Sequence, residues 1–383
     1  MSTLSTLRNH ARLIRTHPAL VGWYLRNRVR EAELGFECKR PDGVGRFPRG
    51  IAIKPTLACN LRCKMCSFAS SGDVLADPKE TLPLEVWTSM VDEVAPFRPY
   101  ISLTGGEPLL YPRISELILH IKKRGLFCTV TSNGTMLTKR APEFMDDPPD
   151  VLIISIDGPS EVHDELRGQP GSYERAAAGI NLVQALKKER RRRRPLLVIN
   201  CVITTFNYRR IEEIIDLARE LRADALNYQH QWSLTRRMIE EHNKRHGEVH
   251  PISCGEVGEI ELPPPDLTEV VEVVRRIRRR THSSNGGTYI TFHPDLGDSE
   301  VYRWYADPHN WVRRRPPACA WITTNVLPNG DVEPCFGMTC GNITRDKFTS
   351  IWNNSAFREH RKRLSRFGDL PVCARCCAYF RRD

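Results

Sequence analysis

Residues 51–66, "IAIKPTLACNLRCKMC", combine a predicted strand with a tight cluster of cysteines. Residues 51–57 form a short apolar run with β-branched side chains, which indicates a buried strand. Cys59, Cys63 and Cys66 follow directly behind it. Three thiolates are too few for a closed zinc site, but they can hold three irons of a [4Fe–4S] cluster and leave the fourth iron open. The spacing therefore favours an iron–sulfur site, while a zinc site would need a fourth ligand from elsewhere.

A repeating strand–helix pattern extends from this point. Residues 113–124 place apolar side chains on one helical face, as do residues 208–222. Such repeats predict an α/β fold, a partial (β/α)6 TIM-like barrel whose ligands lie at the C-terminal ends of its parallel strands. The six predicted strands are residues 51–57, 100–104, 126–131, 151–156, 196–203 and 224–229.

The predicted domain organisation has four parts. Residues 1–45 form a basic helical segment, and residues 46–290 form the barrel. Residues 291–317 read as a linker into a small cysteine-rich α+β domain at 318–383. Within the barrel, the polar, proline-rich stretch 240–265 reads as a loop. Its three histidines, four residues apart, would align on a helix and could bind a metal, but Gly247 and Pro251 favour a solvated loop: His242, His246 and His250.

The C-terminal domain carries a second set of cysteines. "CAWITTNVLPNGDVEPC" joins Cys319 to Cys335 across a predicted hairpin that turns at Asn329–Gly330. Cys340 follows, and "CARCC" ends the set at residues 373–377. Such clustering indicates a second metal site, either an iron–sulfur cluster or structural zinc.

Four further motifs follow the predicted strands in order. They are "TGGEP" (104–108), "TSNG" (131–134), "SIDG" (155–158) and "HDELRG" (163–168). Together with the cysteine triplet, these motifs resemble those of the radical S-adenosylmethionine (SAM) superfamily. The resemblance implies that a [4Fe–4S] cluster on Cys59, Cys63 and Cys66 binds SAM and cleaves it reductively to a 5′-deoxyadenosyl radical, which abstracts a substrate hydrogen.

The resemblance also implies roles for the motif residues. Each of these residue types can instead serve only in a turn or helix cap. Arg167 is expected to pair with the SAM carboxylate, and Glu107 or nearby carbonyls to accept from its ammonium group. The expected SAM-binding residues are Gly105, Gly106, Glu107, Pro108, Asn133, Ser155, Asp157 and Arg167.

The cysteine-rich tail resembles the SPASM or twitch domain of the same superfamily. The shorter twitch form fits better, which implies one auxiliary [4Fe–4S] cluster with no open iron. Its four expected ligands are Cys319, Cys335, Cys373 and Cys376. Cys377 could replace Cys376, and Cys340 could ligate, donate a hydrogen atom or merely pack.

The resemblance implies a radical SAM oxidoreductase, with the reaction left open between two classes. The favoured reaction is dehydrogenase-like oxidation or functionalisation of a C–H position, helped by the auxiliary cluster. The alternatives are a redox-neutral epimerase with Cys340, Cys254 or Cys201 as hydrogen donor, and a modifier of peptide or lipid substrates. The electron donor is expected to be of flavodoxin or ferredoxin type.

Composition bears on partners and location. The 383 residues carry a formal net charge of +11 and 13 cysteines. This balance fits an anionic small-molecule, sugar or lipid-linked substrate, and no specific nucleic-acid module is recognisable. The chain shows no signal peptide and no membrane-spanning apolar run. It is therefore expected in the cytoplasm, with peripheral membrane contact through the N-terminal helix as an open alternative.

Overall fold

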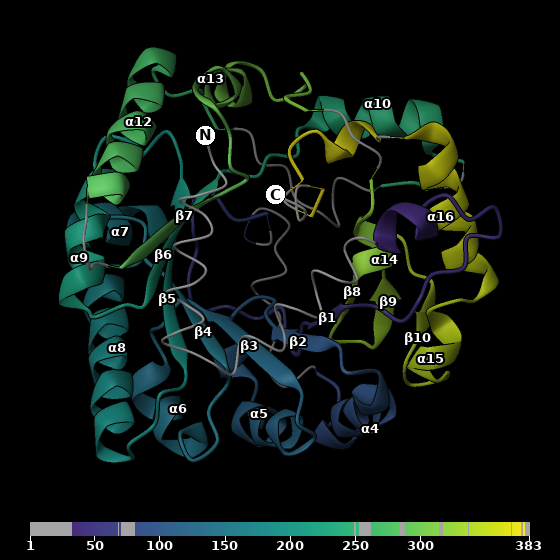
Figure 1. The fold of residues 1–383 in the computed structure, drawn as a ribbon, viewed down its shortest axis with the longest axis horizontal. Helices are drawn as coiled ribbons and strands as arrows, with labels where there is room; N and C mark the ends of the chain where they lie inside the picture. The colour runs from purple at the N-terminus through teal and green to yellow at the C-terminus, as the bar shows by residue number, and fades with distance from the viewer. Residues whose placement is uncertain are drawn as a thin grey trace.

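A parallel sheet with helices on its outer face forms the body of the protein (Figure 1). The computed structural model describes residues 33–67, 69, 81–248, 250–252, 262–283, 288–313, 317–335, 337–368, 370–376 and 378–379. All six strands expected from the sequence are present and pair in parallel in chain order. They are β1 (Gly50–Ile53), β2 (Tyr100–Leu103), β3 (Phe127–Ser132), β4 (Val151–Ser155), β5 (Leu196–Ile203) and β6 (Ala225–His230).

The sheet continues beyond these six strands on both sides. A seventh parallel strand, β7 (Tyr289–His293), pairs with β6. On the other side β8 (Thr323–Val326) pairs in parallel with β1, and β9 (Asp331–Glu333) and β10 (Gly341–Asn342) follow antiparallel. The sheet stays open between β10 and β7, which confirms a partial barrel. The C-terminal domain therefore extends the barrel sheet directly.

Helices connect the strands and cover the outer face of the sheet (Figure 1). The barrel helices are α4 (Leu84–Val94), α5 (Ile114–Lys123), α6 (Leu137–Phe144), α7 (Ser160–Arg167), α8 (Ser172–Glu189), α9 (Ile214–Glu220), α10 (Arg236–His246), α12 (Leu267–Ser283) and α13 (Asp298–Ala306). The C-terminal helices are α14 (Cys319–Ile322), α15 (Phe348–Ile351) and α16 (Ser355–Phe367). Short 3-10 turns include η3 (Pro108–Leu110) and η5 (Pro371–Cys373).

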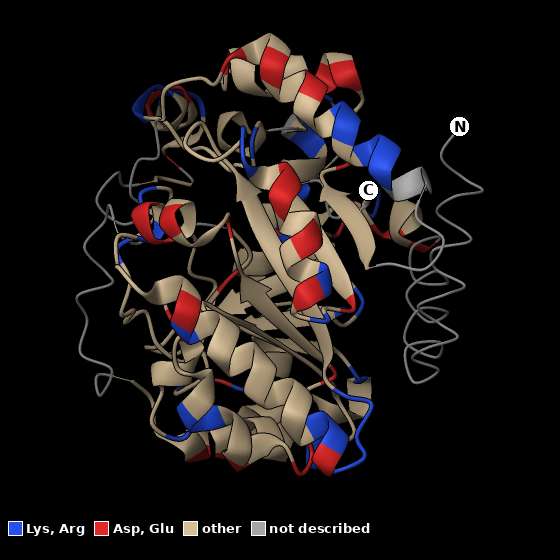
Figure 2. Cartoon of the chain, turned by 90° about the vertical axis from the view of Figure 1, so that its left-hand side faces the viewer, with Lys and Arg blue, Asp and Glu red and all other residues tan. Residues whose placement is uncertain are grey.

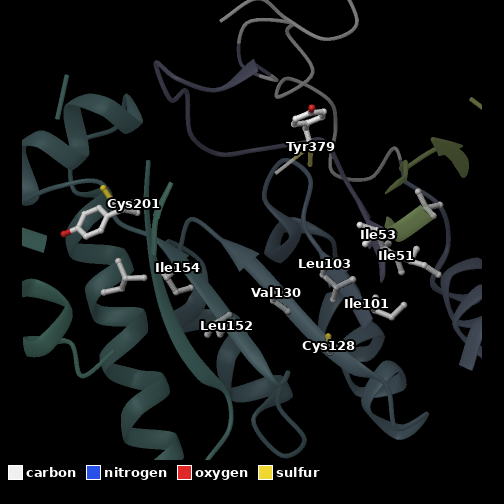
Figure 3. Close-up of a cluster of buried hydrophobic side chains, with 14 of the residues drawn as sticks. Ile51, Ile53, Ile101, Leu103, Cys128, Val130, Leu152, Ile154, Cys201 and Tyr379 are labelled. Atoms are coloured by element: carbon white, nitrogen blue, oxygen red, sulfur yellow. The ribbon is translucent and has the colours of Figure 1, made fainter. Parts of the chain in front are cut away.

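The main core lies between the sheet and these helices. Successive strand residues point to opposite faces, so every second side chain enters this layer. Figure 3 shows the resulting cluster, in which Ile51, Ile101, Val130 and Ile154 are fully buried. Cys128 and Cys201 lie in it with no exposed surface, as expected for cysteines that act as small apolar side chains.

Two expectations about connecting segments are wrong. Residues 240–265 were expected as a loop, but α10 continues through His246 before Gly247 ends it. The expected linker 291–317 contains the end of β7 and all of α13. Val301 and Trp304 of α13 are buried, so this segment belongs to the packed structure.

The basic character of α12 has a local explanation. Arg276 pairs with Glu212 at 3.0 Å, and Arg280 pairs with Asp216 at 3.0 Å. Figure 2 shows acidic and basic residues interspersed over the helices of this face. Residues 1–32 of the expected N-terminal segment 1–45 lie outside the described residues, and residues 33–37 are helical. None of the described helices has the length and apolar character of a membrane span.

Candidate functional site

The cysteine triplet occupies the loop that leaves the C-terminal end of β1. Backbone hydrogen bonds hold this loop to the end of α7, from Arg62 N to Arg167 O and from Lys64 N to Leu166 O. The helix ends at Gly168, whose positive φ of 69° permits a left-handed cap close to the loop. A Cβ atom there would lie 2.6 Å from the Arg62 carbonyl oxygen. Glycine therefore lets α7 approach the cysteine loop.

Nitrogen donors face two of the three sulfurs. Asn133 Nδ2 lies 3.9 Å from Cys59 Sγ, and Arg167 Nη1 lies 3.6 Å from Cys63 Sγ. Burial raises the pKa of the Cys59 thiol to about 11 and also raises that of Cys63. The free thiols of Cys59 and Cys63 would stay protonated at neutral pH, whereas ligation to iron removes the proton. Three half-buried thiols, two of them with an N–H donor nearby, thus fit an iron–sulfur cluster.

The loop after β2 packs against the cysteine loop. A Cβ on Gly105 would lie 2.5 Å from Thr56 O, and a Cβ on Gly106 would lie 2.2 Å from Leu57 O. The absence of side chains at these glycines lets the β1 loop approach closely, and their expected contact with SAM stays a prediction. Their contacts hold the two loops together.

Glu107 has an internal role. Its carboxylate is 1% exposed and accepts hydrogen bonds from Leu109 N, Asn133 N and Ser132 Oγ at 2.7–3.0 Å. It also caps η3, which begins at Pro108. Burial raises the pKa of Glu107 to about 7 despite these donors. Its carboxylate therefore already accepts hydrogen bonds from three protein groups, and the expected contact with SAM stays a prediction.

Asp157 and Arg167 form a buried ion pair rather than two separate ligand contacts. Arg167 Nε donates to Asp157 Oδ2 at 2.6 Å, and Asp157 Oδ1 accepts from Val202 N at 2.9 Å. Burial disfavours the charged guanidinium, but the Asp157 carboxylate and the Cys63 sulfur raise the pKa of Arg167 above its usual range. The pair links β4, β5 and α7 to the cysteine loop. Arg167 remains a proposed SAM-binding residue, with Asp157 and Cys63 already beside it.

A row of polar side chains crosses the concave face of the sheet. Strand register aligns Ser155, Asn200, Asn227 and Thr291 on four neighbouring strands. Thr291 Oγ1 donates to Asn227 Oδ1 at 2.7 Å, and Asn227 Nδ2 donates to Asn200 Oδ1 at 2.6 Å. All four are partly exposed, whereas the flanking residues of β4, β5 and β6 on the other face are fully buried. Only Ser155 of this row belongs to a motif recognised from the sequence. Asn200 and Asn227 lie inside predicted strands without such a motif, and Thr291 lies on β7, which the sequence pattern did not predict.

The expected auxiliary ligands come from three separate segments. Cys319 begins α14, Cys335 follows β9, and Cys373 and Cys376 flank the turn after η5. Cys340 is 5% exposed in the apolar core, and burial raises its pKa to about 12, which favours the packing interpretation. Cys377 lies outside the described residues.

Three residues near the cysteines were not singled out from the sequence. Asn60 Oδ1 accepts from Asn133 Nδ2 at 3.0 Å and so orients the amide that faces Cys59. Arg361 and Arg375 are buried in the C-terminal domain, where burial lowers the pKa of each guanidinium to about 10. Both remain charged at neutral pH. Nothing in the local sequence distinguishes them from the many surface arginines.

His242 of α10, His250 and His360 form a buried cluster, contrary to the expected solvated loop, whereas His246 is half-buried. His242 is fully buried, and its ring lies 4.9 Å from that of His250, which in turn lies 5.5 Å from His360 of α16. His242 Nε2 donates to the His250 carbonyl oxygen at 2.8 Å. Among the described residues no group of His, Cys, Asp or Glu is arranged to hold a single metal ion. The cluster packs α10 against the C-terminal domain.

This packing predicts a loss of stability in mild acid. Burial lowers the pKa of His242 to about 4, below the usual 6.5 of the unfolded chain. The unfolded state therefore binds more protons between these values, and the free energy of unfolding falls as pH drops below 6.5. His242 alone should cost roughly 2 kcal/mol at pH 5. Anaerobic urea unfolding at pH 7 and pH 5 should show a weaker pH dependence in His242→Gln, which keeps the N–H donor. Equal dependence in both proteins would contradict this assignment.

Two family models match the chain. Residues 53–220 match the radical SAM superfamily, and residues 319–377 match SPASM, an iron–sulfur cluster-binding domain. The AdoMet-dependent heme synthase of Methanosarcina barkeri is 36% identical over 341 residues, covering 85% of this chain and 88% of the relative. The PqqA peptide cyclase of Rhizobium meliloti is 27% identical over 334 residues, covering 82% of this chain and 76% of the relative. Streptococcus suis SuiB bound to S-adenosylmethionine shares the fold, with a TM-score of 0.61 and 17% identity, over 82% of this chain and 68% of that one.

Proposed function

Because this chain belongs to the radical SAM superfamily and carries a C-terminal SPASM domain, we propose that it oxidises a C–H position of an anionic substrate. The bound SAM and its [4Fe–4S] cluster would supply the radical that removes the hydrogen atom, and the auxiliary cluster would take the second electron. Cys59, Cys63 and Cys66 would hold the first cluster. Cys319, Cys335, Cys373 and Cys376 would hold the second.

An iron porphyrin is the proposed substrate. The supporting observation is the 36% identity to a heme synthase across 85% of this chain. A shorter match, over 34% of the chain, is to an Fe-coproporphyrin III synthase. Heme carries two vinyl groups where iron coproporphyrin III carries propionates. Converting each propionate removes one hydrogen atom, one electron and carbon dioxide, which is a two-electron oxidation of an anionic molecule. The net charge of +11 suits such a substrate.

Among the described residues, the positions of two candidate hydrogen donors favour oxidation over epimerisation. An epimerase of this kind needs a thiol in the substrate pocket to return a hydrogen atom. Cys201 and Cys340 are buried in the apolar core, and Cys254 lies outside the described residues. Solvent deuterium in an otherwise unchanged product would favour the epimerase.

Anaerobic turnover would test the proposal directly. The reconstituted protein would be mixed with SAM, dithionite and iron coproporphyrin III, and 5′-deoxyadenosine and porphyrin products would be measured by mass spectrometry. Heme formed in step with 5′-deoxyadenosine is the expected result. Steady 5′-deoxyadenosine formation with unchanged porphyrin would exclude this substrate.

The polar row predicts a residue that contacts substrate. The hydrogen-bond directions leave the Asn200 Nδ2 group with no partner among the described residues, so it can donate to a carboxylate or carbonyl. Such a bond is worth about 1.5–3 kcal/mol when the acceptor is charged. Asn200→Leu should therefore lower heme formation at least roughly tenfold while SAM cleavage without substrate stays unchanged. Equal losses in both reactions would mean that Asn200 only supports the fold.

Peptide modification is the second candidate. It is favoured by the match to the PqqA peptide cyclase over 82% of this chain. A peptide substrate would also use an auxiliary cluster as an electron acceptor. Substrate-dependent 5′-deoxyadenosine formation with a peptide, but not with the porphyrin, would support it. A flavodoxin- or ferredoxin-type protein is the proposed electron donor for either reaction.

A further inference from the structure

Two buried cations of the barrel have carboxylate partners, whereas two buried arginines of the C-terminal domain do not. Arg167 pairs with Asp157, and Lys122 Nζ lies 2.5 Å from Asp150 Oδ2. Arg361 and Arg375 are 0% and 1% exposed, yet neither makes an ion pair with a carboxylate in the described part of the chain. Because a buried cation without a counter-charge is costly, this contrast indicates that an anion other than a carboxylate lies near the two arginines.

Arg361 lies beside the first auxiliary cysteine. Its Nε donates to the carbonyl of Ala320, the residue after Cys319, at 3.0 Å. Its Nη1 donates to Asn353 Oδ1 at 2.8 Å, while its buried Nη2 has no hydrogen-bond partner. The guanidinium lies over the Trp352 ring at 4.2 Å. These contacts fix its position without neutralising its charge.

Arg375 lies between the last two auxiliary cysteines, Cys373 and Cys376. Its guanidinium donates to four backbone carbonyls in and after α13, at 2.7–3.1 Å. It also lies 4.8 Å from the Trp304 ring. These hydrogen bonds attach the cysteine loop to α13 through carbonyl oxygens. The nearby Asp307 carboxylate favours the charged guanidinium but makes no ion pair with it in the described part of the chain.

The energetic cost of these two arginines indicates what completes the site. Carbonyl oxygens satisfy N–H groups but carry no net charge, and burying an unpaired cation costs several kcal/mol. A [4Fe–4S] cluster held by four thiolates has two net negative charges when oxidised and one more when reduced. Two guanidiniums next to its ligand segments would balance the oxidised form.

We propose that Arg361 and Arg375 are the counter-charges of the auxiliary cluster and hold its reduction potential up. A nearby positive charge favours the form with the extra electron, because net charge is one of the factors that set cluster potentials. The role goes beyond the proposed reaction and does not depend on which substrate is oxidised. It applies to any reaction in which this cluster receives an electron.

The test measures the potential of the auxiliary cluster alone. The full chain with Cys59, Cys63 and Cys66 changed to alanine would keep only that cluster, and its midpoint would be read by electron paramagnetic resonance during a redox titration. Arg361→Gln and Arg375→Gln should each lower the midpoint by the equivalent of roughly a tenfold change in the reduced-to-oxidised ratio, about 59 mV. The lysine variants should stay near the parent value. Arg363→Gln removes a charge from the same helix, where Arg363 pairs with Glu359 and is partly exposed, and should cause no shift.

The iron content and the midpoint potential of the glutamine and lysine variants together support or overturn the proposal. Glutamine variants with full iron and an unchanged midpoint would overturn the proposal, as would lysine variants that shift as far as glutamine. If glutamine variants fail to hold iron but lysine variants keep it, a required charge is supported. Loss of iron in both would show that guanidinium shape, not charge, is needed, and would also overturn it.

Discussion

Changing Cys59, Cys63 and Cys66 together to alanine is expected to halve the iron content and to abolish SAM cleavage. Anaerobic reconstitution should give about eight irons per chain in the natural protein and about four in the variant. The C-terminal ligands would remain, because they lie on segments separate from the β1 loop, in α14, after β9 and around η5. Iron and sulfide analysis and dithionite-driven 5′-deoxyadenosine formation would be measured together.

A matched control is available in Cys128, which is fully buried on β3 and belongs to the apolar core. Cys128→Ala should keep all its iron and its SAM cleavage. About four irons in the natural protein and none in the triple variant would remove the auxiliary cluster, together with the proposed route for the second electron. A fully loaded natural protein that cleaves no SAM would point to initiation that requires substrate.

Local sequence patterns were sufficient for the barrel strands because each strand is a short apolar run between polar turns. β7 was missed because residues 289–293 are partly exposed along their whole length and lack the apolar run of a buried strand. The pairing of β8 with β1 joins residues about 270 positions apart. Such a contact depends on the tertiary fold, so no local pattern could predict it.

The site shows the same limit. The motifs predicted which residues lie at the ends of the strands, but they did not predict which of these side chains form hydrogen bonds or ion pairs with other protein groups. Glu107 or nearby carbonyls were expected to accept from SAM, and the motif did not show that the Glu107 carboxylate accepts from three protein donors. The three histidines before Pro251 were misjudged for a related reason: Gly247 does end the helix, but His242 and His246 lie before that end.

Removing Asp157 should have the second large effect, on stability and on the first cluster together. Asp157→Ala would leave Arg167 buried without its carboxylate and Val202 N without its acceptor. Breaking a buried ion pair by deleting one partner costs about 3–5 kcal/mol. Urea unfolding of the anaerobic holoprotein should show this loss.

A double variant of the ion pair distinguishes the cost of burying an unpaired charge from the cost of losing hydrogen bonds. Arg167→Met with Asp157→Asn removes both charges, so it should be more stable than Asp157→Ala, although both lack the ion pair. Asp146→Asn is the surface control, because it breaks the Arg190–Asp146 ion pair, in which the Asp146 side chain is 83% exposed. This substitution should change the free energy of unfolding by less than about 1 kcal/mol. A double variant as unstable as Asp157→Ala would show that the cost comes from lost hydrogen bonds. In either case the double variant loses the Arg167 N–H near Cys63, so its SAM cluster should have a lower potential than that of the natural protein.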